Sequence, residues 1–251
     1  MNRIVLVCLL SVVLCHVAWA NLSDESPQNM RRENAKDVHE GEQQTQSKRT
    51  VSNCQNHNGA SKGGSVYVRW GRRDCPEASD LLYSGIAAGS RHRDSPGGGA
   101  NILCLPPDPS FVNPVDGVGG TRAFLYSIEY QLSNYPAWQQ NHLDDVPCAV
   151  CKATGRFSHV MIPAKQTCPS SEWTLEYRGY LMAERSHPVH HKSMFVCVDH
   201  DPKVVPNSSS ADNQNSGRLS LVEGKCSTTG GGLPCNTYPN GKEFTCAVCT
   251  L

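Results

Sequence analysis

Several features are missing from this 251-residue sequence, and each absence excludes a class of protein. It has no H-E-x-x-H or G-x-x-x-x-G-K motif, so it lacks the signatures of zincin proteases and P-loop nucleotide-binding enzymes. Lysine plus arginine and aspartate plus glutamate both number 23, and this balance offers no basic excess for nucleic acid or anionic membranes. No long segment has helical apolar periodicity, which argues against an all-helical fold.

The one long apolar run lies at the start of the chain. Residues 4–14 follow the positively charged start and lead to Ala18-Trp19-Ala20, an A-x-A pattern. This combination predicts a secretory signal peptide over residues 1–20, with the mature chain beginning at Asn21. An uncleaved anchor is the alternative. We favour cleavage, because a membrane-spanning helix needs about 20 apolar residues.

Residues 21–62 differ from the rest in having almost no apolar side chains. Such a segment cannot bury enough surface to offset its ordering entropy, so we predict a disordered polar arm. Lys48-Arg49 is a dibasic pair that would end a propeptide at residue 49, and cleavage there stays open. The sequons at Asn21 and Asn207 predict N-glycosylation in a secreted protein.

Cysteine is the strongest compositional signal. Of thirteen cysteines, Cys8 and Cys15 lie in the predicted signal peptide, which leaves eleven. Ten lie within residues 63–251: Cys75, Cys104, Cys148, Cys151, Cys168, Cys197, Cys226, Cys235, Cys246 and Cys249. In an oxidising compartment this even set predicts a disulfide framework. Cys54, in the arm, is left over and predicts an intermolecular disulfide, with a small-thiol cap as the alternative.

The cysteines also reveal an internal repeat. Cys75-Pro76 recurs 93 residues later as Cys168-Pro169, and the Cys148-x-x-Cys151 motif recurs after 98 residues. We therefore predict two tandem, homologous, Cys-rich β repeats at residues 63–155 and 156–251, related by an approximate two-fold axis.

The fold class is expected to be mostly β. Period-two alternation marks residues 65–70, 123–130 and, in part, 194–198, while glycine and proline punctuate the chain at short intervals. Residues 133–138, which contain two aromatic side chains, are expected to form an irregular loop.

Each C-x-x-C motif has three interpretations. The two motifs together would supply four thiolates for a zinc site, and each alone resembles a redox motif. We favour disulfides, because the secretory route disfavours free thiolates. In an extended strand the two cysteines of one motif face opposite ways, so they should bond to different partners.

A second cluster joins histidine and aspartate. It consists of His187, His190, His191 and His200, with Asp199 and Asp201. These types of side chain can bind zinc or calcium, but a solvated polar loop between strands is the interpretation we favour. We therefore predict no metal, no cofactor and no catalytic residue.

Ten segments of the sequence resemble a known family of domains: 67–72, 75–76, 82–85, 98–101, 104–106, 146–151, 161–164, 168–169, 177–181 and 196–199. Among them are Tyr67-Val68-Arg69-Trp70-Gly71-Arg72 and Val146-Pro147-Cys148-Ala149-Val150-Cys151. Together they resemble the C-terminal non-collagenous domain of sponge short-chain, spongin-type collagens. A more distant similarity is to the non-collagenous C-terminal domain of type IV collagen. The match covers about residues 63–251.

The resemblance implies a disulfide pairing, in which the opening cysteine of each half bonds to the second cysteine of its C-x-x-C motif. The implied pairs are Cys75–Cys151, Cys104–Cys148, Cys168–Cys249, Cys197–Cys246 and Cys226–Cys235. The chain departs from the collagens in having no Gly-X-Y tract, so it cannot form a triple helix.

We therefore expect a secreted structural protein of the extracellular matrix, whether mineralised or spongin-like, and not an enzyme. Its expected partners are other matrix proteins or itself, with no nucleic acid and no membrane. The alternative is a soluble lectin-like or defence protein that binds a glycan through loops such as residues 134–141.

Overall fold

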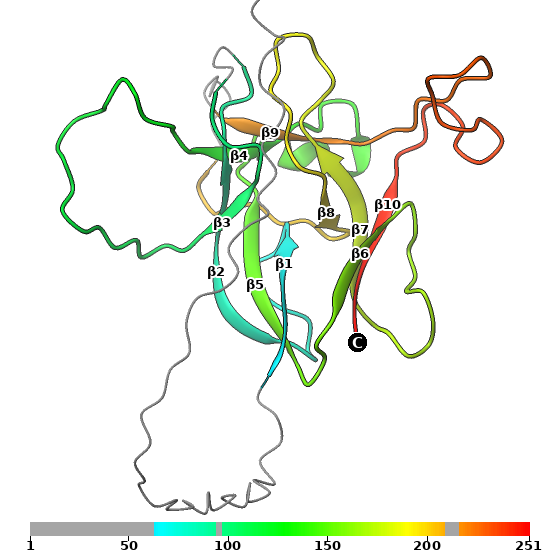
Figure 1. Cartoon of the computed structure of the whole chain (residues 1–251), viewed down its shortest axis with the longest axis horizontal. Coiled ribbons are helices and arrows are strands. Elements are labelled where there is room, and N and C mark those ends of the chain that lie inside the picture. The colour runs from blue at the N-terminus through cyan, green and yellow to red at the C-terminus, as the bar shows by residue number, and fades with distance from the viewer. Residues whose placement is uncertain (1–62, 94–96, 209–215) are drawn as a thin grey trace, which may run out of the picture. The chain divides into compact units, whose positions relative to one another are not determined.

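The computed structural model describes residues 63–93, 97–208 and 216–251. The elements are β1 (Gly64–Trp70), β2 (Asp80–Gly89), β3 (Leu103–Leu105), β4 (Tyr126–Tyr130), η1 (Pro136–Asn141), β5 (Pro147–Thr154), β6 (His159–Pro163), β7 (Thr174–Ala183), β8 (Val196–Asp199), β9 (Gly217–Leu221) and β10 (Thr245–Thr250) (Figure 1). The mostly β prediction is confirmed. The predicted signal peptide and polar arm, residues 1–62, lie outside the described residues.

All ten strands belong to one sheet. The hydrogen-bonded order is β6-β10-β7-β8-β1-β5-β2-β4-β9, and β3 pairs with β2 beside this path. Strand β9 also pairs with β7, so the path returns on itself. Two parallel pairings, β1 with β8 and β4 with β9, join strands of the first half to strands of the second.

Strand pairing in the two halves corresponds pair by pair. In the first half β5 lies between β1 and β2, and β3 follows on the other side of β2; in the second, β10 lies between β6 and β7, and β8 follows. The register corresponds too. Cys148 is opposite Trp70 and Gly85, and its equivalent Cys246 is opposite the equivalent residues, Pro163 and Gly179. An approximate two-fold axis relating the halves stays a prediction.

Tyr83-Ser84-Gly85 recurs 94 residues later as Tyr177-Arg178-Gly179, and the glycines of this Tyr-x-Gly motif have a packing role. A Cβ added at Gly85 would lie 1.7 Å from the carbonyl oxygen of Leu105, and one at Gly179 would lie 1.7 Å from that of Val198. Only glycine lets the neighbouring strand approach this closely. The motif therefore repeats because the same strand contact occurs in each half.

The predicted strand boundaries are partly displaced. Residues 65–70 lie within β1, and the run at 194–198 contributes only its end to β8, which begins at Val196. The run at 123–130 forms a strand only from Tyr126, which is opposite Gly89, the last residue of β2. Residues before Tyr126 alternate in sequence, but β2 offers them no partner, and Phe124 and Leu125 are exposed.

The core consists of two clusters. One is built around Trp70, Tyr130, Trp138, Val146 and Val198, and it draws on both halves. The other contains Tyr67, Tyr177, Leu181 and Val248, and it also spans both halves. Cysteines of the C-x-x-C motifs lie in both clusters, so the disulfides are part of the packed interior.

Candidate functional site

The ten cysteines of residues 63–251 form five disulfides. The pairs are Cys75–Cys151, Cys104–Cys148, Cys168–Cys249, Cys197–Cys246 and Cys226–Cys235. They are the pairs that the resemblance implies, and the two cysteines of each C-x-x-C motif bond to different partners. None of these ten thiols is left to ligate zinc. Cys54 and Asn21 lie outside the described residues.

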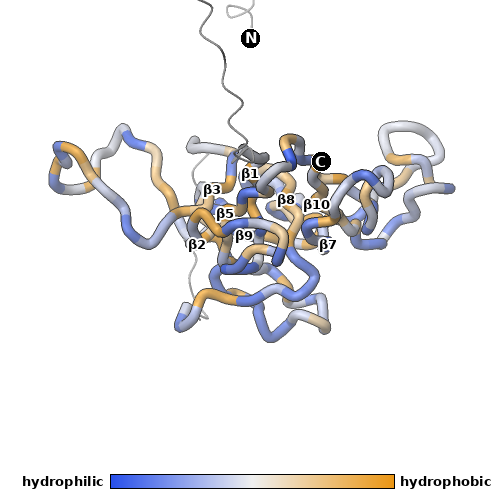
Figure 2. The backbone as a smooth tube through the Cα atoms, turned by 90° about the horizontal axis from the view of Figure 1, so that it is seen from below, coloured by the Kyte–Doolittle hydropathy of each residue, from blue (hydrophilic) through white to orange (hydrophobic). Residues whose placement is uncertain are grey.

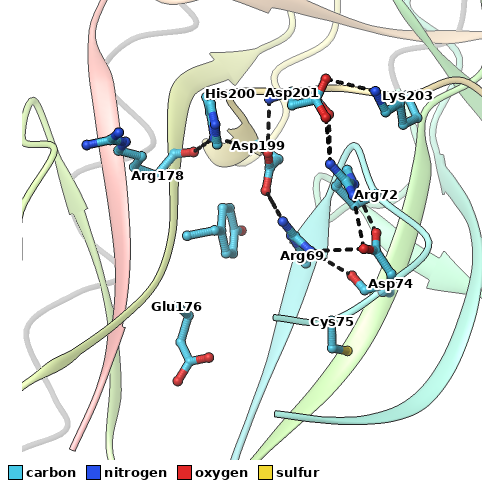
Figure 3. Close-up of polar contacts among 12 residues, drawn as sticks. Arg69, Arg72, Asp74, Cys75, Glu176, Arg178, Asp199, His200, Asp201 and Lys203 are labelled. Carbon is cyan, nitrogen blue, oxygen red and sulfur yellow. Dashed lines mark hydrogen bonds and ion pairs between the residues drawn. The ribbon is translucent and has the colours of Figure 1, made fainter. Parts of the chain in front are cut away.

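An ion-pair network joins β1 to the end of β8 (Figure 3). The Arg69 guanidinium donates from Nε, at 2.8 Å, to Oδ2 of Asp199, whose side chain is fully buried. Oδ1 of Asp199 accepts from the backbone N–H of Asp201 at 2.9 Å. Because a buried carboxylate is costly without such partners, this pair fixes the position of β1 against β8.

The outer part of the same network is exposed to solvent. Arg72 forms a two-point ion pair with Asp74, at 2.9 and 3.0 Å, and also reaches Asp201 at 2.8 Å. The hydrogen bond from Arg72 lowers the pKa of Asp74. Lys203 contacts Asp201 at 2.8 Å. Exposed pairs of this kind contribute little to stability, so Arg69 with Asp199 is the main contact here.

A second buried carboxylate, Glu176 on β7, also connects the halves. Its Oε2 accepts from the Tyr67 hydroxyl at 2.7 Å and from Ser79 at 2.8 Å. Its Oε1 accepts from Arg156 at 2.8 Å and from Thr250. Burial raises the pKa of Glu176, but these hydrogen bonds outweigh burial and hold it below its usual value. Glu176 is therefore ionised and saturated with donors.

Strand β1 of the first half also contacts β7 and β8 of the second directly. Tyr177 on β7 donates to the carbonyl oxygens of Val68 and Cys197, at 3.0 and 2.9 Å, and packs near Tyr67. Val198 on β8 pairs with Trp70 of β1 and is fully buried.

The equivalent strands of the first half, β2 and β3, lie side by side (Figure 2) and leave several apolar side chains exposed. Tyr83 is 39% exposed although its repeat partner Tyr177 is 5% exposed. On β3, Leu103 is 44% and Leu105 is 36% exposed. The residues at the equivalent repeat positions on β8, Val196 and Val198, are 2% and 0% exposed. Leu81, Leu82 and Ile86 of β2 are also exposed. Ile86 is directly opposite Leu105, and Leu103 is opposite Ala88, so these exposed side chains share one face of the β2–β3 pair. We call Ile86, Leu103 and Leu105 the uncovered face.

A groove on the second half is the other unfilled surface. It has a volume of about 410 Å³ and is lined by Met161, Pro163, Ala164, Leu181, Phe195, Val222, Leu233, Tyr238 and Phe244. By repeat spacing, Pro163 and Phe195 correspond to Trp70 and Ile102, which are buried in the core cluster that includes Val198. The groove adjoins β6, whose one hydrogen-bonded neighbour among the described strands is β10.

The predicted His/Asp cluster divides into two places. His187 and His190 lie together, with ring centroids 4.7 Å apart, whereas Asp199, His200 and Asp201 belong to the ion-pair network at β8. The described residues contain no group of three or more such side chains arranged to hold a metal ion.

The aromatic loop at 134–141 was expected to be exposed and irregular. Most of its residues are exposed, but the expectation is wrong for its indole and for its backbone. Residues 136–141 form the 3₁₀ helix η1, and the indole of Trp138 is buried. Its ring packs edge-on against Tyr180 and Tyr135, with centroids 5.1 and 5.5 Å apart. Because Trp138 is part of the core, it offers no stacking surface for a sugar.

Two further sequence features can be placed. Asn207 is exposed, as a glycosylated asparagine must be, although the last residue of its sequon lies outside the described residues. Residues 59–63, Gly-Ala-Ser-Lys-Gly, match the G-x-S-x-G pattern of hydrolases. Of these five residues the structure describes only Gly63, which leads into strand β1.

Comparison with models of protein families and with curated protein sequences finds no match for the chain. Within the described residues, no helix has the length and apolar character needed to cross a membrane.

Proposed function

We propose that this protein is a secreted structural component of an extracellular matrix that assembles through its uncovered face. The observation that carries the proposal is the unequal burial of repeat-equivalent residues. The same strand positions that are buried on β7 and β8 are exposed on β2 and β3. Contiguous exposed apolar surface on a folded protein is typical of an interaction site.

The contact between the two halves provides a template for assembly. Within the chain, β1 of the first half pairs with β8 of the second. Their repeat equivalents, β6 and β3, each have one hydrogen-bonded neighbour among the described strands. Pairing β6 of one copy with β3 of another would repeat the internal contact between molecules. A head-to-tail contact of this kind yields rings or filaments, as a structural role requires.

The five disulfides support the same role. They restrict the unfolded chain and suit a protein that must persist outside the cell. Native protein should accumulate in detergent-insoluble matrix. Recovery as freely soluble protein in body fluid would instead favour the lectin-like alternative.

Charging the uncovered face is expected to abolish self-association. In a Leu103→Lys/Leu105→Lys variant, two exposed side chains of β3 would place ammonium groups where the contact needs apolar surface, with Cys104 still in the core. Sedimentation velocity at matched concentrations should show oligomers for the wild type and monomers for the variant. Val189→Lys, which changes a 55% exposed valine in another loop, is the control. A wild type that stays monomeric at tens of micromolar would contradict self-assembly.

Cys54 is expected to add a covalent link. An exposed thiol without a partner in the oxidising exterior is captured by another thiol. On a non-reducing gel we expect a dimer, or a larger adduct with another matrix protein, which Cys54→Ser converts to monomer. A monomer band in both lanes would rule out cross-linking through this residue.

A further inference from the structure

A second surface forms where one loop from each half meets. The loop after β2 and the loop after β7 are joined by a β-bridge between Arg93 and His190. The backbone N–H of His191 also donates to the carbonyl of His92 at 3.0 Å, and His92 bonds through Nδ1 to the Ser216 carbonyl at 2.7 Å. We call residues 90–93 and 184–193 the loop crossing.

The loop crossing is hollowed. A cavity of about 600 Å³, within the range of small-ligand sites, is lined by Arg185, His187, His190, His191 and Lys192 with Ser186 and Ser193. A smaller hollow beside it shares His191, Lys192 and Ser193 and adds Arg91 and Arg218. Cationic groups and hydroxyl donors therefore line part of two adjacent depressions, together with Glu184 in both and with apolar Phe195, Leu221 and Val222 in the larger one.

The acidic side chains here do not cancel this charge. Glu184 is buried and already accepts three hydrogen bonds, from His190 at 2.9 Å and from the backbone N–H groups of Arg185 and Arg218 at 3.1 Å. Burial raises its pKa to about 7, so it is only partly ionised near neutral pH. Glu223, at the rim, is exposed. Four cationic side chains, Arg91, Arg185, Lys192 and Arg218, line the two hollows. A third carboxyl group, that of Glu129, is opposite Arg218 in the β4–β9 pairing, and burial raises its pKa.

The neighbouring histidines respond to the same positive potential. Burial first, and then Arg185, His187, Arg218 and Arg93, lower the pKa of His190 to about 4. Burial and nearby cationic groups also lower that of His92. The chain as a whole is neutral, so this positive region is local.

We propose that the loop crossing binds a sulfated polysaccharide. Two adjacent cationic hollows that share Lys192 and His191 fit a ligand with anionic groups repeated along a chain better than a single ion. Sulfate esters stay ionised throughout the physiological range, and the serine hydroxyls and imidazoles can bond to sulfate and sugar oxygens. The inference goes beyond the proposed assembly, since it uses a different surface.

Heparin hexasaccharide is the probe that tests this proposal, by titration calorimetry at 150 mM NaCl with the full mature chain. Arg185→Glu/Lys192→Glu should weaken binding by about tenfold or more, because two attractive charges become repulsive. The single variant Lys192→Glu keeps Arg185 and its contact with His190. It should therefore weaken hexasaccharide binding less than the double variant does. The control, Arg73→Glu/Lys242→Glu, makes the same charge change at exposed sites outside the loop crossing and should change affinity less than about twofold.

Several outcomes would overturn the proposal. They are absence of wild-type binding, an equal loss in the control, equal affinity for inorganic sulfate, or equal affinity for polyglutamate. The last two would identify a free oxyanion or an acidic peptide as the ligand. Leu103→Lys/Leu105→Lys should still bind the hexasaccharide, which separates this site from assembly. Thermal unfolding of every variant checks that it is folded.

Discussion

Replacing Glu176 with alanine is expected to lower the free energy of unfolding by about 3–5 kcal/mol, the cost of breaking a buried ion pair from one side. The carboxylate is fully buried and accepts from four side chains: Tyr67, Ser79, Arg156 and Thr250. Its loss leaves buried donors unsatisfied between the halves. Urea unfolding at pH 7 measures the effect.

The same carboxylate predicts a dependence on pH. Its hydrogen bonds hold the folded-state pKa below the ordinary 4.5. The stability it contributes is therefore complete above about pH 4.5 and is lost as pH falls through the folded pKa. The wild type should lose more stability than Glu176→Ala between pH 5 and pH 3.

An exposed glutamate provides the control. Glu77 lies on the surface in the β1–β2 connection, and Glu77→Ala should change stability by no more than about 0.5 kcal/mol. A Glu176→Ala protein within about 1 kcal/mol of the wild type would show that the carboxylate does not hold the halves together.

Removal of the Cys75–Cys151 disulfide is expected to cost about 4–5 kcal/mol, from loop-closure entropy over a sequence separation of 76 residues. Cys151 is also fully buried, so truncation to alanine removes packed atoms from the core. Equilibrium unfolding of Cys75→Ala/Cys151→Ala tests the estimate.

The short-loop disulfide is the matched control. Cys226 and Cys235 are only nine residues apart, so their replacement should cost about 3 kcal/mol in the same loop-closure treatment. Equal losses for the two double variants would contradict the loop-length argument. A greater loss of unfolding free energy on removal of Cys226–Cys235 would show that this short-loop disulfide stabilises the fold more than Cys75–Cys151 does.

Local pattern alone supported several conclusions about this chain. The period-two alternation at residues 65–70 predicts a strand, because strand side chains alternate between faces regardless of what covers them. The same alternation points the side chains of Cys148 and Cys151 to opposite faces of the strand, so they bond to different cysteines. The repeated Tyr-x-Gly motif recurs at equivalent strand contacts, at Gly85 and Gly179.

Neither the uncovered face nor the loop crossing could be predicted this way, because both depend on which segments meet. His92 and His190 are 98 residues apart, yet their rings lie 5.1 Å apart where the two loops cross. Trp138 was misplaced for a similar reason, since a short polar stretch gave no sign that Tyr180 would pack on it.

Tyr83 and Tyr177 separate most clearly what each level decides. They occupy the same place in the repeat, so the sequence by itself predicts the same local structure for both, and a glycine follows each two residues later. Only the tertiary structure makes one 39% and the other 5% exposed. Tyr67 and Val68 of the first half contact Tyr177, whereas the Tyr83 hydroxyl bonds to the Cys104 carbonyl of its own half. Strand formation follows local side-chain alternation, whereas burial is a property of the neighbour that packs against the strand.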